Sequence, residues 1–370
     1  AAVRWCAVEA LGRLGLPEAV PDLAALVSGG ERSLRLKAVD ALGVLGPAAL
    51  PEIRTALRNE DNGVQWCAAE ALGRLGLPET APDLAALAKG ADRSLRLKAV
   101  EALGLLGPGG LEALQEALRD PDGEIRAEAV RAIARTPGSR SVDLLCDALL
   151  RYGEEVRRAA AEALGGFSDA RVVPALLAAL RDPSLQVRRA AAESLGRREE
   201  LGEVAPRLGE ALRDDDMAVR IRIAAVLTGV GAPAAPVFAQ ALLDGDADLR
   251  WRAGQALVQI GEPAVPILCA LLNSEEAEYR ERAAEVLAPL ALLHPCAALR
   301  GAIPALRRRL LPWSMEGEPA RQSYQAALQA IRQATAGLKD LPLPAAAPAV
   351  APGDLPIPGG RQDGRKGEEE

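Results

Sequence analysis

The single histidine of this chain, His294, limits the catalytic chemistry that its side chains can perform. Serine and cysteine nucleophiles usually need a histidine as general base, and zinc needs three or four nitrogen or sulfur ligands at one point. His294 lies in the segment LLHPC, where we expect it to cap a helix or to face solvent. We therefore predict a protein with no catalytic residue, no metal site and no cofactor.

The five cysteines, at positions 6, 67, 146, 269 and 296, are scattered along the chain and show no CxxC spacing. Cys6 and Cys67 take equivalent places in a duplicated segment, two repeats apart, which is too far for a disulfide. We expect reduced thiols packed in the core of a cytoplasmic protein.

The charge and composition exclude several other classes of protein. The chain carries 44 Lys and Arg against 51 Asp and Glu, a net charge of −7, which disfavours general binding to nucleic acid or to an anionic membrane. No apolar run is long enough to predict a membrane-spanning helix. Hydrophobic residues make up 49% of the chain but aromatic residues only 2%, and a composition rich in Ala and Leu favours closely packed helices.

The elements that position these side chains come from an internal repeat. Residues 3–46 match residues 64–107 with ten differences in 44 positions, and a shorter helical phrase recurs at half that period. Its first apolar residue falls at Val3, Leu34, Val64, Leu95, Ile125, Val156, Val187, Val219, Leu249 and Tyr279. A shorter apolar helix precedes each phrase except the first, so the pattern predicts a stack of helix pairs. The chain begins at Ala1 in the middle of this pattern, which leaves open whether further residues precede it.

Each pair carries its own start and stop signals. The first helix usually has Pro in its first turn, where the missing N–H is not needed, and the second ends at Gly. Numbering the second helix from its first apolar residue as position 0, positions 0, 4, 7, 8 and 11 are apolar and predict a buried face. In the first repeat these residues are Val3, Ala7, Ala10, Leu11 and Leu14. Positions 2, 5, 6 and 9 are expected to point the opposite way, with the glycines at position 9 allowing helices to approach closely.

The phrases VRRAAAEALG (156–165) and VRRAAAESLG (187–196) resemble HEAT repeats, and in particular the short HEAT-like repeats also found in phycobilisome bilin lyases. The resemblance implies an all-α fold, an α-solenoid in which about ten helix pairs form a right-handed superhelix over residues 1–291. Residues 292–336 are expected to form atypical capping helices, and the Pro/Ala/Gly-rich residues 337–370 a disordered tail. HEAT-repeat deoxyhypusine hydroxylase uses several His-Glu pairs to hold iron, and this sequence has none.

Position 1 of the second helix is an arginine column, interrupted once by Gln65. Acids in the turns, such as Asp120 and Asp182, are placed to pair with these arginines, and the resemblance implies an Asp/Arg ladder that joins repeats. A functional alternative concerns residues 307–309, three arginines that could contact a phosphate backbone, although a solvated helix face explains them more simply.

The candidate binding residues are those at positions 2 and 6, which core packing leaves over. Position 2 supplies a ridge of Trp5, Leu36, Trp66 and Leu97, with Trp251 further along, and position 6 supplies an acidic row of Glu9, Asp40, Glu70 and Glu101. An apolar ridge beside an acidic row is unusual for a solvated surface, although the tryptophans could instead pack against neighbouring repeats.

We therefore expect a non-catalytic scaffold or adaptor that binds a protein or peptide with basic and apolar residues in its concave groove. The alternative is a bilin lyase-like or chaperone subunit that holds a tetrapyrrole or a client protein. Specific nucleic-acid and membrane partners are not expected, and the sequence says nothing of the oligomeric state.

Overall fold

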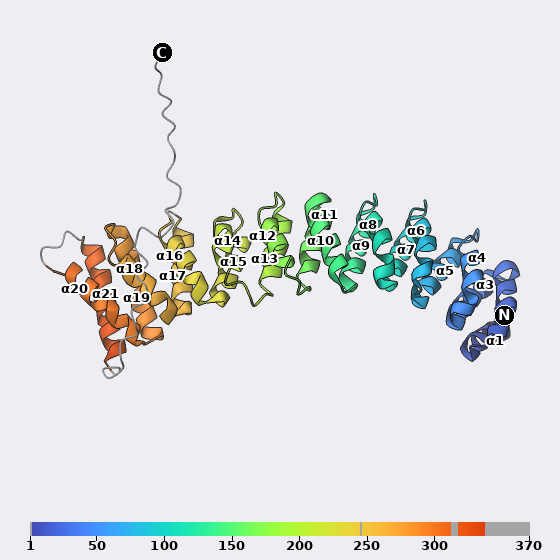
Figure 1. Ribbon diagram of the computed structural model, residues 1–370, viewed down its shortest axis with the longest axis horizontal. Helices are drawn as coiled ribbons and strands as arrows, with labels where there is room; N and C mark the ends of the chain where they lie inside the picture. The colour runs from blue at the N-terminus through green and yellow to red at the C-terminus, as the bar shows by residue number, and fades with distance from the viewer. Residues whose placement is uncertain (1, 245, 312–316, 337–370) are drawn as a thin grey trace, which may run out of the picture. The chain divides into compact units, whose positions relative to one another are not determined.

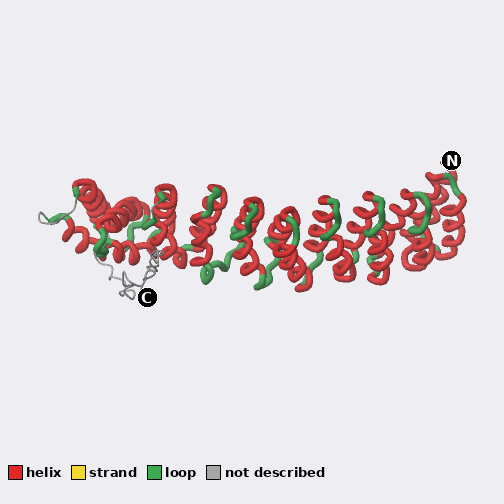
Figure 2. The backbone as a smooth tube through the Cα atoms, turned by 90° about the horizontal axis from the view of Figure 1, so that it is seen from above, coloured by secondary structure: helices red, strands yellow, loops and turns green. Residues whose placement is uncertain are grey.

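The computed structural model describes residues 2–244, 246–311 and 317–336, so the predicted tail at 337–370 lies outside the described residues. The described part is built from α-helices and short 3-10 turns and contains no strand (Figure 2). This confirms the all-α solenoid of HEAT-like helix pairs, while its handedness stays a prediction. The chain divides into two compact units, Ala1–Arg197 and Arg198–Glu370.

The first unit begins with one unpaired second helix, α1 (Ala2–Leu14), and continues as six helix pairs among its described residues. The pairs are α2 (Val20–Gly29) with α3 (Arg32–Leu45), α4 (Leu50–Ala56) with α5 (Asn62–Leu75), α6 (Ala81–Leu87) with α7 (Arg93–Leu105), α8 (Leu111–Ala117) with α9 (Gly123–Arg135), α10 (Ser139–Arg151) with α11 (Glu154–Leu164), and α12 (Val172–Ala179) with α13 (Leu185–Leu195). Each second helix packs on the next one, which forms a continuous layer from α1 to α13 (Figure 1).

The second unit repeats the arrangement with α14 (Ala205–Glu210) and α15 (Met217–Val230), α16 (Ala235–Leu242) and α17 (Ala247–Ile260), and α18 (Val265–Leu271) and α19 (Ala277–Leu293). The last described helices are α20 (Ile303–Arg309) and α21 (Glu318–Thr335), and α21 packs along α19. The predicted boundary between residues 291 and 292 falls inside α19, whose last residues lie beyond it. The division into repeats, cap and tail stays a prediction.

The start and stop signals work as the sequence predicts. One proline lies within the first two positions of each of the first helices α2, α4, α6, α14, α16 and α18. The second helices α3, α5, α15 and α17 end at glycines with positive φ, Gly46, Gly76, Gly231 and Gly261, a backbone conformation that L side chains rarely adopt. A short 3-10 turn, which the sequence did not predict, precedes most of the proline-initiated helices.

The buried face of the second helix is wider than predicted. In α5 the residues at positions 0, 4, 7 and 8 are fully buried, as expected. Position 5, which was expected to point away, is buried as well throughout the layer, at Val39, Ala69, Val100, Val130, Ala161 and Ala192. The reason is that each second helix packs against its own first helix and also against the second helices on both sides, so three of its sides are covered.

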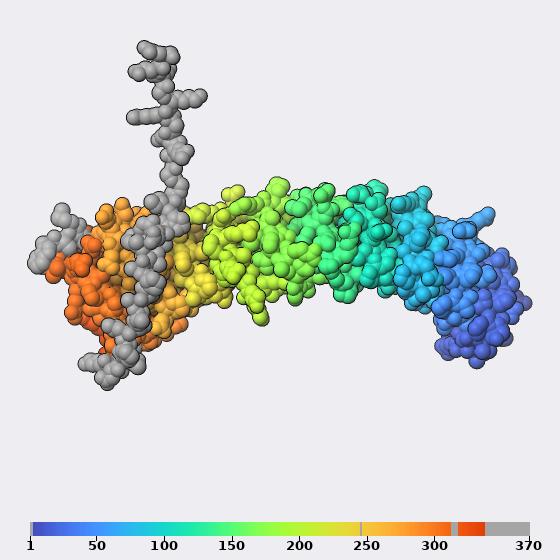
Figure 3. Space-filling model, viewed as in Figure 1, coloured from blue at the N-terminus to red at the C-terminus, as the bar shows by residue number. Residues whose placement is uncertain are grey.

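Position 9 also faces a neighbour and not the open side. A Cβ on Gly104 would lie 2.8 Å from the Cβ of Ala132 on the next second helix, and a Cβ on Gly12 would lie 2.9 Å from that of Ala41. The predicted role of these glycines in close helix approach is confirmed. On the face of the first unit visible in Figure 3, neighbouring pairs form a continuous surface.

Helix α1, at the start of the chain, departs from the predicted buried stripe. Val3 is 82% exposed, and Ala7, Ala10 and Leu14 are exposed as well. Positions 0, 4 and 7 are buried in α5, and position 11 is half-buried, because α4 and the neighbouring second helices cover them. In the described residues α1 has no helix of that kind in front of it, so its stripe stays open.

Candidate functional site

The predicted ridge lies along the layer of second helices in the first unit. Trp5 on α1 is 42% exposed and Trp66 on α5 is 37% exposed, while Leu36 on α3 and Leu97 on α7 are half-buried. The four side chains occupy the same helical position on four consecutive second helices, since these pack on each other in the order α1, α3, α5 and α7. The two tryptophans belong to the surface and not to the core.

Each of these tryptophans carries a lysine from the next repeat over its ring. The Lys37 ammonium lies 4.6 Å from the Trp5 ring centroid, and the Lys98 ammonium lies 4.0 Å from that of Trp66. Both distances are within the range of a cation–π interaction. Each tryptophan is therefore partly exposed and also contacts a side chain of the neighbouring repeat.

Sequence reasoning missed these two lysines, which occupy position 3 of α3 and α7. The sequence did contain a signal: each lies three residues before an acid of the row, in the duplicated phrase RSLRLKAV. Spacing of three residues on a helix brings side chains together, so the Lys–acid pair was visible locally. The placement of the lysine over a tryptophan about 32 residues earlier was not.

The acidic row is mostly neutralised within the unit. Three of its four acids hold a cation: Glu9 with Arg13 at 2.6 Å, Asp40 with Arg74 at 2.8 Å and Lys37 at 3.3 Å, and Glu101 with Lys98 at 2.6 Å. Burial raises the pKa of Asp40, but the hydrogen bonds from Arg74 and Lys37 outweigh it, so the pKa lies below its ordinary value. Glu70 is the member of the row that makes no ion pair with any residue in the described part of the chain.

The arginine column forms the predicted ladder. Arg157 on α11 donates to both carboxylate oxygens of Asp182 in the turn before α13, at 2.8 and 2.9 Å, and to the Tyr152 carbonyl in its own turn at 3.0 Å. Arg96 holds Asp120 in the same way. Arg35, Arg96 and Arg157 thus join their own repeats to the next ones, which gives these members of the column a structural role; Arg4 is exposed and makes no ion pair with the residues described.

The ladder also shifts the titration of its acids. The hydrogen bond from Arg35, helped by the backbone N–H of Gly63, lowers the pKa of Asp61 to about 2. Where Gln65 interrupts the column, its amide donates to the Asn59 carbonyl of its own turn at 2.6 Å. Glutamine therefore keeps the bond within the repeat.

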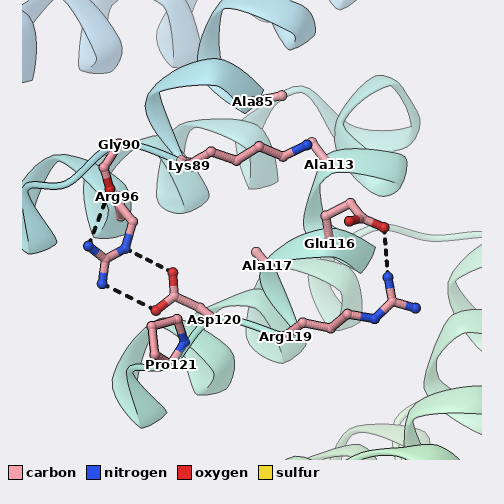
Figure 4. A pocket seen from close by; sticks show the side chains of 11 residues that line it. Ala85, Lys89, Gly90, Arg96, Ala113, Glu116, Ala117, Arg119, Asp120 and Pro121 are labelled. Carbon is pink, nitrogen blue, oxygen red and sulfur yellow. Dashed lines mark hydrogen bonds and ion pairs between the residues drawn. The ribbon is translucent and has the colours of Figure 1, made fainter.

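A hollow of about 390 Å³ lies beside one step of this ladder, at the ends of α6 and α8 (Figure 4). Its small lining residues include Ala85, Ala113 and Ala117, and the Arg96–Asp120 pair forms one wall. The Arg119–Glu116 ion pair, 2.8 Å long, closes the opposite side. The Lys89 side chain extends toward Ala113 in this view. The charged groups in two of the walls are thus already paired.

A second cavity, of about 300 Å³, lies on the layer of second helices in the second unit, between α17 and α19. Trp251, the third tryptophan of the predicted site, lines it and is 62% exposed. Glu285 and Arg282 of α19 line the opposite side. The structure thus places Trp251 at the same helical position as Trp5 and Trp66, but on a different unit.

The cysteines are less uniform than predicted. Cys6 is exposed and Cys67 is half-buried, so the expectation that both are core residues is wrong. Position 3 faces the preceding repeat, and the described part of the chain has no repeat before α1 to cover Cys6. Burial raises the pKa of Cys269 to about 12, which keeps that thiol protonated at neutral pH.

The histidine follows the C-terminal end of α19, where its backbone N–H donates to the Leu290 carbonyl at 2.8 Å. Its ring packs on Gly261, since a Cβ there would lie 3.0 Å from the imidazole. Within the described ranges no three His, Cys, Asp or Glu side chains are grouped so that they could hold a metal ion. In the same ranges, no helix combines the length and the apolar character that crossing a membrane requires.

The arginines at 307–309 lie in the last turn of α20, where Arg307 and Arg308 are exposed. A cationic side chain is favourable at a helix C-terminus, which supplies a structural reason for this cluster. Trp313, four residues after this cluster, lies outside the described residues.

The solved structures with a similar fold include three that illustrate the low level of sequence identity. An engineered protein is 22% identical, with a TM-score of 0.37, covering 88% of this chain and 98% of its own. Human deoxyhypusine hydroxylase, solved with glycerol, is 25% identical with a TM-score of 0.32, covering 71% of this chain and 99% of its own. The complex of CpcE and CpcF of phycocyanin lyase from Nostoc sp. PCC7120 is 22% identical with a TM-score of 0.33, covering 60% of this chain and 94% of that chain.

Among curated protein sequences, none matches this chain. The family is shown instead by the repeats themselves. The PBS lyase HEAT-like repeat matches residues 3–29. HEAT repeats match residues 23–104, 84–164, 151–216 and 205–288, which together cover most of the chain. The chain therefore belongs to the HEAT-repeat family.

Proposed function

We propose that this protein is a non-catalytic scaffold that binds a partner protein or peptide on the layer of second helices. The observation that carries the proposal is the ridge of Trp5, Leu36, Trp66 and Leu97, which the fold leaves partly exposed on four consecutive helices. Tryptophans are the commonest anchors of protein interfaces, and a row of them on a rigid layer costs little ordering on binding.

The chemistry of the ridge defines the partner. Apolar side chains spaced by one repeat, about 10 Å, would meet the four ridge residues in turn. The Lys37 and Lys98 side chains cover part of each indole, so a partner would contact the open part of the ring and the aliphatic stem of the lysine. Because three acids of the row are already paired, Glu70 is the acid that would attract a basic residue of the partner.

The test is an affinity capture with the full chain, followed by measurement of Kd for each purified partner retained. The double variant Trp5→Ala with Trp66→Ala is expected to weaken that partner by more than tenfold, since truncating one buried interface tryptophan typically costs about 2 kcal/mol or more. The far-UV circular dichroism should stay that of the parent, because both side chains lie on the surface.

The matched control is Leu150→Ala. This variant also removes an exposed apolar side chain, but from α10, a first helix outside the layer of second helices. It should leave Kd unchanged. If the tryptophan variant folds and every retained partner binds it normally, the ridge is not the binding surface.

A matched pair of charge variants tests the role assigned to the acidic row. Glu70→Gln should flatten the salt dependence of the association rate, because it removes an unpaired charge near the ridge. Glu9→Gln should have a smaller effect, since Glu9 is already paired with Arg13. Equal effects would contradict the assignment.

The second candidate is a bilin lyase-like or chaperone subunit. One observation favours it: the PBS lyase HEAT-like repeat matches the segment that contains Trp5. Coexpression with an open-chain tetrapyrrole and measurement of visible absorbance distinguish the two candidates. A purified protein that retains a bilin, and loses it in the double tryptophan variant, would favour this alternative.

A further inference from the structure

The first unit contains the same three-part arrangement twice: a tryptophan at position 2, and a lysine and an acid at positions 3 and 6 of the next second helix. Lys98 lies 4.0 Å from the Trp66 ring centroid and 2.6 Å from the Glu101 carboxylate. Lys37 lies between Trp5 and Asp40 in the same way. An ammonium held between an indole face and a carboxylate is thus a recurring unit of this surface.

In the second unit the tryptophan and the acid recur, but the lysine does not. Trp251 is at position 2 of α17 and Glu285 is at position 6 of α19. Position 3 of α19 is Arg282, whose guanidinium forms an ion pair with Glu278 and donates to the Leu242 carbonyl at 3.2 Å. The cation over the Trp251 ring is Arg252 of the same helix, 5.9 Å from the ring centroid, and Trp251 stays more exposed than Trp5 or Trp66.

The place that the lysine would take is a cavity. The space of about 300 Å³ between α17 and α19 has Trp251 and Glu285 in its lining, together with apolar residues such as Leu242 and Val258. Gly254 contributes to the hollow, because the equivalent position carries Val or Ala in the first unit. The volume is at the lower end for ligand sites and suits a single side chain.

The cavity has one carboxylate without a partner. Glu285 makes no ion pair with any residue that the structure describes, and burial, followed by the nearby Glu281, raises its pKa. The arginines in the lining are already engaged: Arg282 as above, and Arg250 with the Asp244 carbonyl at 3.0 Å. A cation entering the cavity would therefore meet a carboxylate that makes no ion pair and an indole that is 62% exposed, although Arg252 lies 5.9 Å from the ring centroid.

We propose that the cavity between α17 and α19 receives a lysine side chain of a partner protein, with its ammonium between the Trp251 indole and the Glu285 carboxylate. In the first unit Lys98 of the same chain supplies the ammonium between an indole and a carboxylate. In the second unit a lysine of the partner would supply it. This proposal rests on the protein-binding role proposed above and adds a second contact, of defined chemistry, on the second unit.

The probe that tests it is Nα-acetyl-lysine N-methylamide, which carries the side chain without any other partner surface. The full chain, with its tryptophan indoles labelled with ¹⁵N, is titrated with this probe at low salt. The Trp251 indole resonance, which is assigned from its loss in Trp251→Phe, should shift and reach saturation. Glu285→Gln should raise the half-saturation at least about threefold, the size of effect expected for one partly exposed ion pair.

Two controls are matched to these changes. Glu193→Gln removes the same charge at position 6 of α13, where the acid already pairs with Arg197, and should leave the titration unchanged. The Nε-acetylated form of the probe keeps the stem but loses the charge and should not saturate. A linear response, an equal response to the uncharged probe, or no effect of Glu285→Gln would overturn the proposal.

The first unit supplies a gain-of-binding test. Lys98→Ala should vacate the place over Trp66, so that the Trp66 resonance, silent in the parent, begins to respond to the probe; Lys37→Ala should do the same at Trp5. If neither indole responds in folded variants, the arrangement is not a lysine site and the proposal is wrong. The capture experiment measures the Kd of a whole partner on the unaltered ridge, so its result does not depend on whether a free lysine side chain binds, and failure of the two proposals can be told apart.

Discussion

Removing Arg157 should destabilise the protein far more than removing its neighbour Arg158. Arg157→Ala deletes two hydrogen bonds to Asp182 and one to the Tyr152 carbonyl. The arginine side chain is 19% exposed and the aspartate 9%, so water replaces these bonds only partly. Asp182 keeps the backbone N–H of Ser184 as a donor.

The magnitude follows from the burial and the charge. Breaking a fully buried ion pair costs about 3 to 5 kcal/mol, and a hydrogen bond to a charged group contributes about 1.5 to 3 kcal/mol. With partial exposure and one donor left on Asp182, we expect a loss of about 2 to 4 kcal/mol. At a urea m value of about 2 to 3 kcal/mol/M this lowers the midpoint by about 1 M.

The assay is urea unfolding followed by circular dichroism at 222 nm, with Arg158→Ala as control. Arg158 is one residue further along α11, is 46% exposed and pairs with Glu162 one turn away, so its removal should cost less than about 0.5 kcal/mol. The two variants lose the same charge from the same helix. Equal midpoints, or additive effects of Arg157→Ala and Asp182→Ala, would refute the claim that the ladder joins the repeats.

Three further outcomes are expected. Asp61 has a pKa of about 2 in the folded chain against 3.8 in the unfolded one, so its contribution to stability is present above pH 4 and is lost as the pH falls toward 2; urea unfolding of Asp61→Asn at several pH values should show a smaller loss over this window, and an unchanged acid dependence would contradict the ion pairing. Gly104→Ala should lower the melting temperature and cost about 1 to 3 kcal/mol, because the new Cβ would lie 2.8 Å from an alanine of the next second helix. Gly229→Ala should stabilise the protein by about 0.5 to 1 kcal/mol, because the new Cβ meets no atom within 4 Å. A reversed order of the two melting temperatures would contradict the packing. Cys6 should react first with a thiol reagent at neutral pH and Cys269 should react last, as followed by mass spectrometry of the labelled peptides, since one is exposed and burial raises the pKa of the other to about 12.

Much of the fold could be predicted from the sequence because its determinants are local. The recurring phrase, the prolines at helix starts and the glycines after helix ends define each pair within about 30 residues. The Asp/Arg ladder was also predictable, since Arg157 and Asp182 repeat in register with the helices. The glycines at position 9 belong to the same class, because a missing Cβ at a fixed place in every repeat indicates a close neighbour.

The buried face could be predicted only in part. A helical wheel gives the direction of each side chain around one helix, but it does not say how many neighbours surround that helix. Val39 and Val100 were assigned to the open side because they lie opposite position 0, yet the adjacent second helices cover them completely. For the same reason Val3 and Cys6 on α1 are exposed, although the same positions in later repeats are buried or partly covered.

The sequence by itself determined which residues stand at positions 2, 3 and 6, and it determined the Lys98–Glu101 pair through its spacing. Only the tertiary structure decided that Lys98 lies over Trp66, because that contact depends on the distance and rotation between two helices about 30 residues apart. It also decided that Arg282, at the equivalent position, pairs with Glu278 and donates to the Leu242 carbonyl, and makes no ion pair with Glu285. Such choices depend on competition among partners brought together by packing, and the order of residues along one helix does not encode the outcome.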